Sequence, residues 1–129
     1  MKHWIAGLAI MILVVSCQST KEEFSGLTPM THEQLKQKYV PGTKVRFTNM
    51  RGINGTTEYG ENRSIQLIMD NGYSDKGVYS IEGNKFCSTY SSTYNGAKRC
   101  GTIYDVGNGR FRALNEKDEE EYRNLKWVK

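Results

Sequence analysis

The sequence predicts a mainly β fold: a small antiparallel meander that closes into a roughly eight-stranded barrel, with one short N-terminal helix and one disulfide. Two observations predict it. From Thr43 onward, apolar residues recur at every second position, which is typical of half-buried strands. Turn sequences rich in Gly and Asn separate these stretches at intervals of about 8–12 residues, the spacing of an all-β sandwich or barrel. Closure would pair the two exposed edges of the meander.

The chain begins like an exported protein. Lys2 precedes an apolar run over Trp4–Val15, and a small residue follows at Ser16. A basic start, an apolar stretch of about 7–15 residues and small residues at the cleavage site describe a secretory signal peptide. The run is shorter than the roughly 20 residues of a membrane-spanning helix.

The end of this leader, Val14-Val15-Ser16-Cys17, resembles the lipobox of bacterial lipoproteins. The resemblance implies that residues 1–16 are removed and that Cys17 is lipidated, which anchors the protein to a membrane of the cell envelope. The alternative is an ordinary secretory leader with a chance cysteine. In a Gram-negative host, Gln18 in place of an aspartate favours the outer membrane, with the domain facing the periplasm.

We expect residues 17–26 to form a polar tether and residues 27–129 to form a single domain, since a chain of this length builds one modest core. The formal net charge of +4 is mild and does not call for nucleic acid as a partner. Within the domain, Thr31–Tyr39 predicts a helix. Thr31 and Gln34 have capping-box spacing, Leu35 and Tyr39 share a face, and Pro41-Gly42 ends the pattern.

The predicted strands follow this helix and are joined by tight turns. They cover residues 43–49, 54–59, 63–69, 73–81, 84–90, 97–106, 109–114 and 122–128. The acidic run Glu116–Glu121 falls between the last two strands. We interpret it as a solvated loop or helical turn, since it lacks the spaced oxygen ligands and the glycine of a calcium loop.

Cys87 and Cys100 are the cysteines that remain beyond Cys17, and in an exported small domain such a pair usually forms a disulfide. A free thiol or metal pair is the alternative, although the spacing is not that of a metal site. Asn95-Gly96 is a strong two-residue hairpin signal, but a tight turn there would not place the two cysteines opposite each other. We therefore expect Ser91–Gly96 to be a loose connection.

Few residues beyond the leader have catalytic chemistry. His32 is the one histidine there, and we interpret it as a solvated surface residue. No phosphate-binding glycine loop is present, and we expect no cofactor and no metal. An enzyme that uses Asp70, Asp75 or Glu82 beside Tyr73 or Tyr79 is a third hypothesis. These carboxylates fall in turns, where they favour local hydrogen bonds.

Two sets of residues are candidates for binding. Tyr90 and Tyr94 flank a polar loop beside the cysteine pair, and tyrosine offers contact area with a polar tip. The basic residues alternate outward on the first and the seventh predicted strands: Lys44, Arg46, Arg110 and Arg112. Closure of the barrel would bring these charges together, and such a patch attracts anionic partners.

The sequence after the tether resembles a family of small exported bacterial proteins of unknown function. The resemblance rests on the short helix, the Gly77–Ile81 strand, Gly83–Cys87, and a second cysteine ahead of Ile103-Tyr104. Tyr79 stands where that family usually has tryptophan. The resemblance implies a β-rich, disulfide-bonded domain and no catalytic activity.

Together these features predict a lipid-anchored envelope protein that acts as a non-catalytic binding or structural module. Its partner would be an envelope protein or a small apolar ligand, since an eight-stranded barrel can hold one small ligand. The alternative is a periplasmic inhibitor or immunity protein against a cell-wall hydrolase or toxin, which would present one protruding loop.

Overall fold

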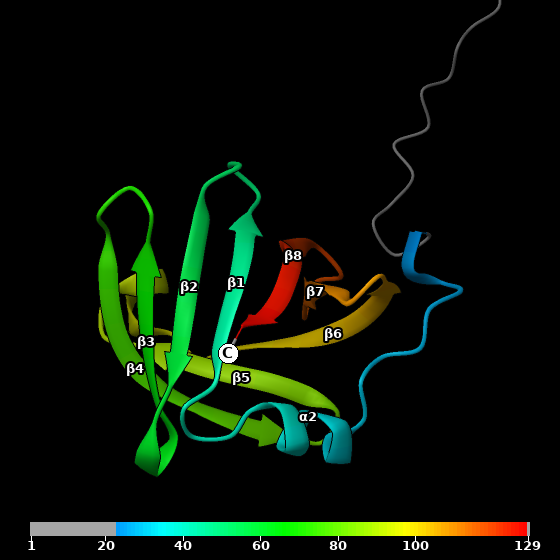
Figure 1. Cartoon of the computed structure of the whole chain (residues 1–129), viewed down its shortest axis with the longest axis horizontal. Coiled ribbons are helices and arrows are strands. Elements are labelled where there is room, and N and C mark those ends of the chain that lie inside the picture. Colours follow the sequence, from blue (N-terminus) through cyan, green and yellow to red (C-terminus); the bar gives the residue numbers. More distant parts are fainter. Residues whose placement is uncertain (1–22, 129) are drawn as a thin grey trace, which may run out of the picture.

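The computed structural model describes residues 23–128 and shows a closed barrel with a short helix at one end (Figure 1). The proposed signal peptide, the lipidation site Cys17 and most of the expected tether lie outside the described residues. No helix among residues 23–128 is long and apolar enough to cross a membrane. The elements are α2 (His32–Lys38), β1 (Lys44–Asn49), β2 (Asn54–Tyr59), η1 (Glu61–Arg63), β3 (Ser64–Met69), β4 (Ser74–Glu82), β5 (Lys85–Tyr90), η2 (Thr93–Gly96), β6 (Arg99–Gly107), β7 (Arg110–Asn115) and β8 (Glu120–Val128).

Each strand pairs antiparallel with the next, and β8 pairs with β1, where Val128 faces Lys44. The predicted eight-stranded meander and its closure are therefore confirmed. Strands that alternate apolar and polar residues bury one face inside the barrel, and closure leaves no unpaired edge.

The helix α2 closes one end of the barrel. Thr31 caps it as predicted: the Thr31 hydroxyl accepts from the Gln34 amide at 3.2 Å, and the Gln34 side chain accepts from the Thr31 amide at 2.9 Å. Leu35 is fully buried. His32, expected at a solvated surface, is partly exposed; its Nδ1 lies 2.7 Å from the Gly83 carbonyl oxygen and so joins the helix to the β4–β5 turn.

Tyr39, at the end of α2, extends this closure into the core. Its ring stacks on Phe86 at 4.4 Å between centroids and meets the edges of Tyr59 at 4.8 Å and Trp127 at 5.5 Å. Aromatic rings in such arrangements stabilise a core beyond the area that they bury. The closed end is therefore filled with side chains.

The segment ahead of α2 packs on the outside of β6 and β7. Phe24 is only 3% exposed; its ring lies 4.9 Å from that of Tyr104 and beneath the Arg112 guanidinium at 4.6 Å. The Met30 amide donates to the Ile103 carbonyl at 2.7 Å. Phe24 falls in the stretch expected to be a tether, so the packed domain extends at least to this residue.

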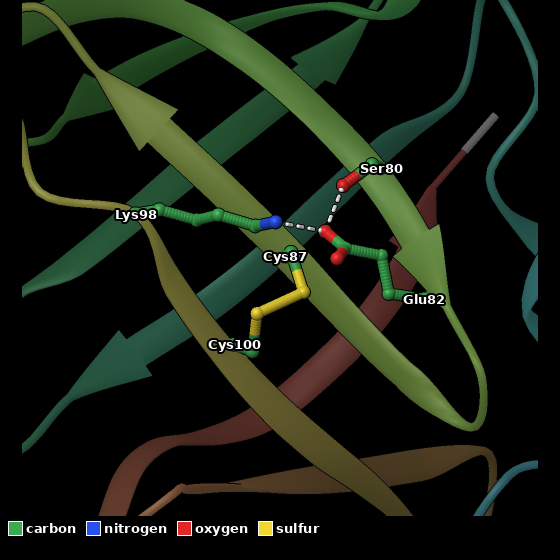
Figure 2. The surroundings of a disulfide bond; sticks show 5 residues. All are labelled: Ser80, Glu82, Cys87, Lys98 and Cys100. Atoms are coloured by element: carbon green, nitrogen blue, oxygen red, sulfur yellow. Dashed lines mark hydrogen bonds and ion pairs between the residues drawn. A yellow bond between two sulfur atoms is a disulfide. The ribbon is translucent and has the colours of Figure 1, made fainter.

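Cys87 of β5 and Cys100 of β6 face each other and form the predicted disulfide on the outer side of the barrel (Figure 2). The preference for the cysteines over a tight Asn95-Gly96 turn is confirmed: the connection runs through the short η2 helix. In Figure 2 the Glu82 carboxylate lies beside the disulfide, where it binds Lys98 at 2.5 Å and Ser80 at 2.7 Å.

Candidate functional site

The end of the barrel opposite α2 is open. The connections that follow β1, β3, β5 and β7 meet there and surround a pocket of about 690 Å³, which we call the mouth. Figure 1 shows the β1–β2 and β3–β4 connections projecting at this end. The mouth has an apolar wall that includes Phe47, Ile53, Leu67 and Met69, and a polar rim that includes Asn49, Asn71, Ser92 and Thr93.

A second, smaller cavity of about 70 Å³ lies deeper in the barrel, between the mouth and Tyr39. Four polar side chains line both spaces and separate them: Tyr94, Arg99, Glu121 and Tyr122, which we call the polar layer. Below this layer the inner cavity is walled by aromatic and aliphatic side chains, with few polar groups such as Ser88 and Thr57.

The polar layer is a connected network. Arg99 and Glu121 form an ion pair, with side chains 33% and 16% exposed. The Arg99 guanidinium lies 3.9 Å from the centre of the Tyr94 ring, a cation–π arrangement. The Tyr94 and Tyr122 hydroxyls lie 3.2 Å apart. The layer therefore offers one positive and one negative group, flanked by two aromatic rings, in a partly desolvated position.

Strand geometry explains why these side chains point inward. Arg99 begins β6 in phase with Gly101 and Ile103, whose positions line the inner cavity. On β8, the register against β1 shifts between Lys126 and Arg123, and Asn124 takes a positive φ of 55°. An extra residue of this kind is a β-bulge, and it changes which side chains face inward. As a result Tyr122 and Leu125 both line the inner cavity.

The buried tyrosines remain neutral. Burial raises the pKa of Tyr39, Tyr59, Tyr90 and Tyr122, because a phenolate would lose its hydration there. Their hydroxyls can therefore donate and accept hydrogen bonds, as the Tyr59 and Thr57 hydroxyls do at 2.8 Å. The inner cavity carries polarity without charge below the Arg99–Glu121 pair.

Asp75 fixes the β5–β6 connection over the mouth. Its carboxylate accepts hydrogen bonds from the Thr93 hydroxyl at 2.6 Å, the Thr93 amide at 2.7 Å and the Ser92 amide at 3.1 Å. These bonds, above all the one from the Thr93 hydroxyl, hold the pKa of Asp75 well below its usual range. The Ser91–Gly96 segment is the longer connection expected in place of a tight turn, and Asp75 ties it to β4.

The structure separates the two candidate tyrosines. Tyr90 ends β5, is buried and lines the inner cavity rather than a loop tip. Tyr94 lies in η2, is 39% exposed and belongs to the polar layer. Of the two, only Tyr94 has a position from which it can contact a molecule that enters the mouth.

The four basic candidates do not join into one patch. Closure brings β1 beside β8, as expected, but β8 lies between β1 and β7. Lys44 pairs with Glu58 at 3.4 Å, and Arg46 binds Asp70 through two hydrogen bonds of 2.9 Å. Arg112 pairs with Glu23 and Glu120, while Arg110 is exposed at the start of β7. Neighbouring carboxylates thus neutralise three of these four charges.

The acidic run is only partly a solvated loop. Glu120 and Glu121 belong to β8, and the Glu120 side chain is only 4% exposed. Burial alone would raise the pKa of Glu120, but hydrogen bonds from Arg112 and Arg123 outweigh it and lower the pKa. The interpretation as a solvated segment is wrong for these two residues, because arginines on neighbouring positions pair with them.

Carboxylates elsewhere are engaged in local contacts. Glu82, Cys87 and Cys100 bring one oxygen and two sulfur atoms within 4.8 Å of one another. Both sulfurs belong to the disulfide, so they offer no thiolate, the form in which cysteine binds metals. Asp70 and Asp75, named for a carboxylate enzyme, bind Arg46 and the β5–β6 loop respectively.

Arg99, Glu121 and Tyr122 were not among the site residues predicted from the sequence. A signal existed for Arg99, since it lies in phase with Ile103 on a predicted strand. No comparable signal existed for Tyr122 and Glu121. Tyr122 precedes the bulge at Asn124, and Glu121 is an extra residue between Glu120 and Tyr122 in the pairing of β8 with β7.

No family model matches the chain. The searches of curated proteins and of solved structures also found no match. The function proposed below therefore rests on the residues and geometry of this chain.

Proposed function

We propose that this protein is a lipid-anchored, non-catalytic binding protein of the cell envelope that takes up a small ligand at the mouth of its barrel. The observation that supports it is the charged polar layer between the mouth and the inner cavity. Binding sites for small molecules are typically concave, largely apolar and furnished with a few placed polar groups. The mouth of about 690 Å³ combines an apolar wall with a polar and charged rim, and the inner cavity beneath it is mainly apolar.

The Asp75 contacts add to this proposal. A loop that is already ordered loses little conformational entropy when a ligand binds, so less of the interaction energy is spent on ordering. Thr93 is held by Asp75 and also lies 2.7 Å from the Tyr73 hydroxyl. Tyr94, the next residue, is thereby presented to the mouth in a fixed position.

The anchor rests on the lipobox-like sequence at Cys17. Cells expressing the full chain should incorporate an alkyne-labelled fatty acid into the protein, and Cys17→Ala should abolish the label. Ser19→Ala, which leaves both the lipobox and the disulfide intact, is the matched control. Labelling of Cys17→Ala to the wild-type level would contradict the proposed anchor.

Ligand uptake is tested by incubating the full chain with an envelope extract, releasing bound small molecules and identifying them by mass spectrometry. Ala113→Leu should reduce capture, since Ala113 lines the inner cavity and the larger side chain would occupy it. Thermal unfolding of the variant confirms that it is folded. Capture of no small molecule by the wild-type protein would refute the uptake function.

An inhibitor of an envelope enzyme is the second candidate, and one observation favours it. The β1–β2 connection projects at the open end, and Met50 at its tip is 51% exposed (Figure 1). An inhibitor would lose its enzyme partner on Met50→Asp and keep it on Ala113→Leu, whereas a ligand-binding barrel would lose its small molecule on Ala113→Leu. Copurification with a hydrolase that is lost on Met50→Asp and kept on Ala113→Leu would support the inhibitor.

A further inference from the structure

The charges of the polar layer indicate which class of ligand the mouth accepts, an inference that rests on the proposed function. Arg99 and Glu121 are paired with each other at the boundary of the inner cavity. Glu120, the neighbouring carboxylate, is already bound by Arg112 and Arg123. Arg51 and Glu119 also line the mouth, but they do not line the inner cavity. A molecule that reaches the layer therefore meets one positive and one negative side chain, and it can pair with either of them only by displacing the other.

A ligand with a single charge would fit this pair poorly. An anion that binds Arg99 breaks the Arg99–Glu121 ion pair and leaves the Glu121 carboxylate unpaired. A cation that binds Glu121 likewise leaves the Arg99 guanidinium unpaired. Leaving a partly buried charge unpaired is costly, and the cost offsets the gain from the new contact. A ligand carrying both charges restores a partner to each side chain.

We propose that the mouth binds a small zwitterion: an α-amino acid with an aliphatic side chain. Its carboxylate pairs with the Arg99 guanidinium, which suits the planar geometry of a carboxylate. Its ammonium group pairs with Glu121 and lies beside the ring of Tyr122, whose face attracts cations. The Arg99 guanidinium lies 3.9 Å from the centre of the Tyr94 ring, and this contact holds the partner of the ligand's carboxylate in place.

The size of the inner cavity limits the side chain. Its volume is about 70 Å³, and an apolar cavity of roughly 150 Å³ holds a benzene molecule. A branched side chain of three or four carbons therefore fits, and an aromatic one does not. We expect valine and leucine to bind better than glycine or phenylalanine.

Isothermal titration calorimetry of the full chain tests this assignment with glycine, valine, leucine and phenylalanine. N-acetylleucine lacks the cation and leucinamide lacks the anion. Each should bind at least about tenfold more weakly than leucine, because each loses a charge-assisted contact. Arg99→Met and Glu121→Gln should weaken leucine binding to the same extent.

Two further variants keep the test independent of folding. Arg99→Met/Glu121→Met removes both charges together, so it leaves none unpaired; it should remain folded by thermal unfolding and still fail to bind leucine. Lys98→Met removes the adjacent cation, which binds Glu82 outside the barrel, and should bind leucine within about twofold of the wild-type protein.

The outcomes separate this inference from the proposed function. N-acetylleucine or leucinamide binding as tightly as leucine would overturn the zwitterion. The zwitterion assignment would also be overturned if none of the four amino acids bound while the extract experiment captured another small molecule. In that case the proposed uptake at the mouth would stand. Failure of both experiments would refute uptake and zwitterion together.

Discussion

The disulfide should contribute more than an ordinary cross-link, because it bridges the shortest seam of the barrel. The facing residues of β5 and β6 run only from Phe86–Gly101 to Ser88–Arg99, with the disulfide at the middle position. By contrast, β4 and β5 face each other from Gly77–Tyr90 to Glu82–Lys85. Loss of the cross-link should therefore open the barrel between β5 and β6 first.

The magnitude follows from the loop that the bond closes. Cys87 and Cys100 are separated by 13 positions, and closing a loop of that length stabilises the folded state by about 3 kcal/mol in the chain-entropy model. For a domain of this size, each kcal/mol changes the melting temperature by about 4–8 °C. Reduction should therefore lower it by roughly 12–24 °C.

Urea unfolding of the oxidised and the reduced wild-type chain measures this difference without a change of sequence. Cys87→Ala/Cys100→Ala should lose somewhat more, since Cys87 is buried and its truncation also removes packing. Hydrogen exchange should increase first in β5 and β6. A difference below about 1 kcal/mol, or exchange that rises equally in all strands, would refute this reasoning.

Three other substitutions test the remaining features. Asp75→Asn should make the melting temperature less sensitive to acid below about pH 5. The folded-state pKa of Asp75 is depressed, so its contribution to stability is present above the usual pKa of 3.8 and is lost as the pH falls. A melting temperature that depends on pH as steeply as that of the wild type would contradict this. Tyr39→Ala should lower the free energy of unfolding in urea by about 3–5 kcal/mol, whereas Tyr39→Phe, which keeps the ring, should lower it much less. Equal losses in the two variants would show that the ring contacts at the closed end are unimportant. Gly77→Ala should lower the free energy of unfolding in urea by about 2 kcal/mol or more, because the new Cβ would lie 2.1 Å from the Thr89 carbonyl oxygen. Gly26→Ala, with open space around it, is the control and should leave the stability nearly unchanged.

The local rules of the sequence were sufficient for the scaffold. Alternation and the turn sequences between the stretches located all eight strands, and the Thr31–Gln34 capping box located the start of α2, since these signals arise from neighbouring residues. The cysteine pair also determined the register of β5 and β6 correctly against the Asn95-Gly96 signal. In the loop between β5 and β6, the covalent constraint of the disulfide overrode the local turn preference of Asn95-Gly96.

The candidate site was less predictable, because it depends on geometry between strands. The bulge at Asn124 turns Tyr122 inward, and a strict alternation cannot anticipate an inserted residue. In the sequence, Glu121 is one of several acidic residues in a run predicted to be solvated, whereas in the structure it forms an ion pair with Arg99. Tyr90 looked like a loop residue and proved to be a core residue, since β5 extends to it.

The pairing of β1 with β8 has a consequence for how the molecule matures. Lys44 and Val128 stand at nearly opposite ends of the described chain, yet they are partners. Contacts between such distant positions slow folding, because a long segment must be ordered before they form. The barrel cannot close before β8 is in place, and until then β1 and β7 each leave a row of backbone groups open to other chains. The timing with which β8 docks thus determines whether the chain closes on itself or pairs with another chain.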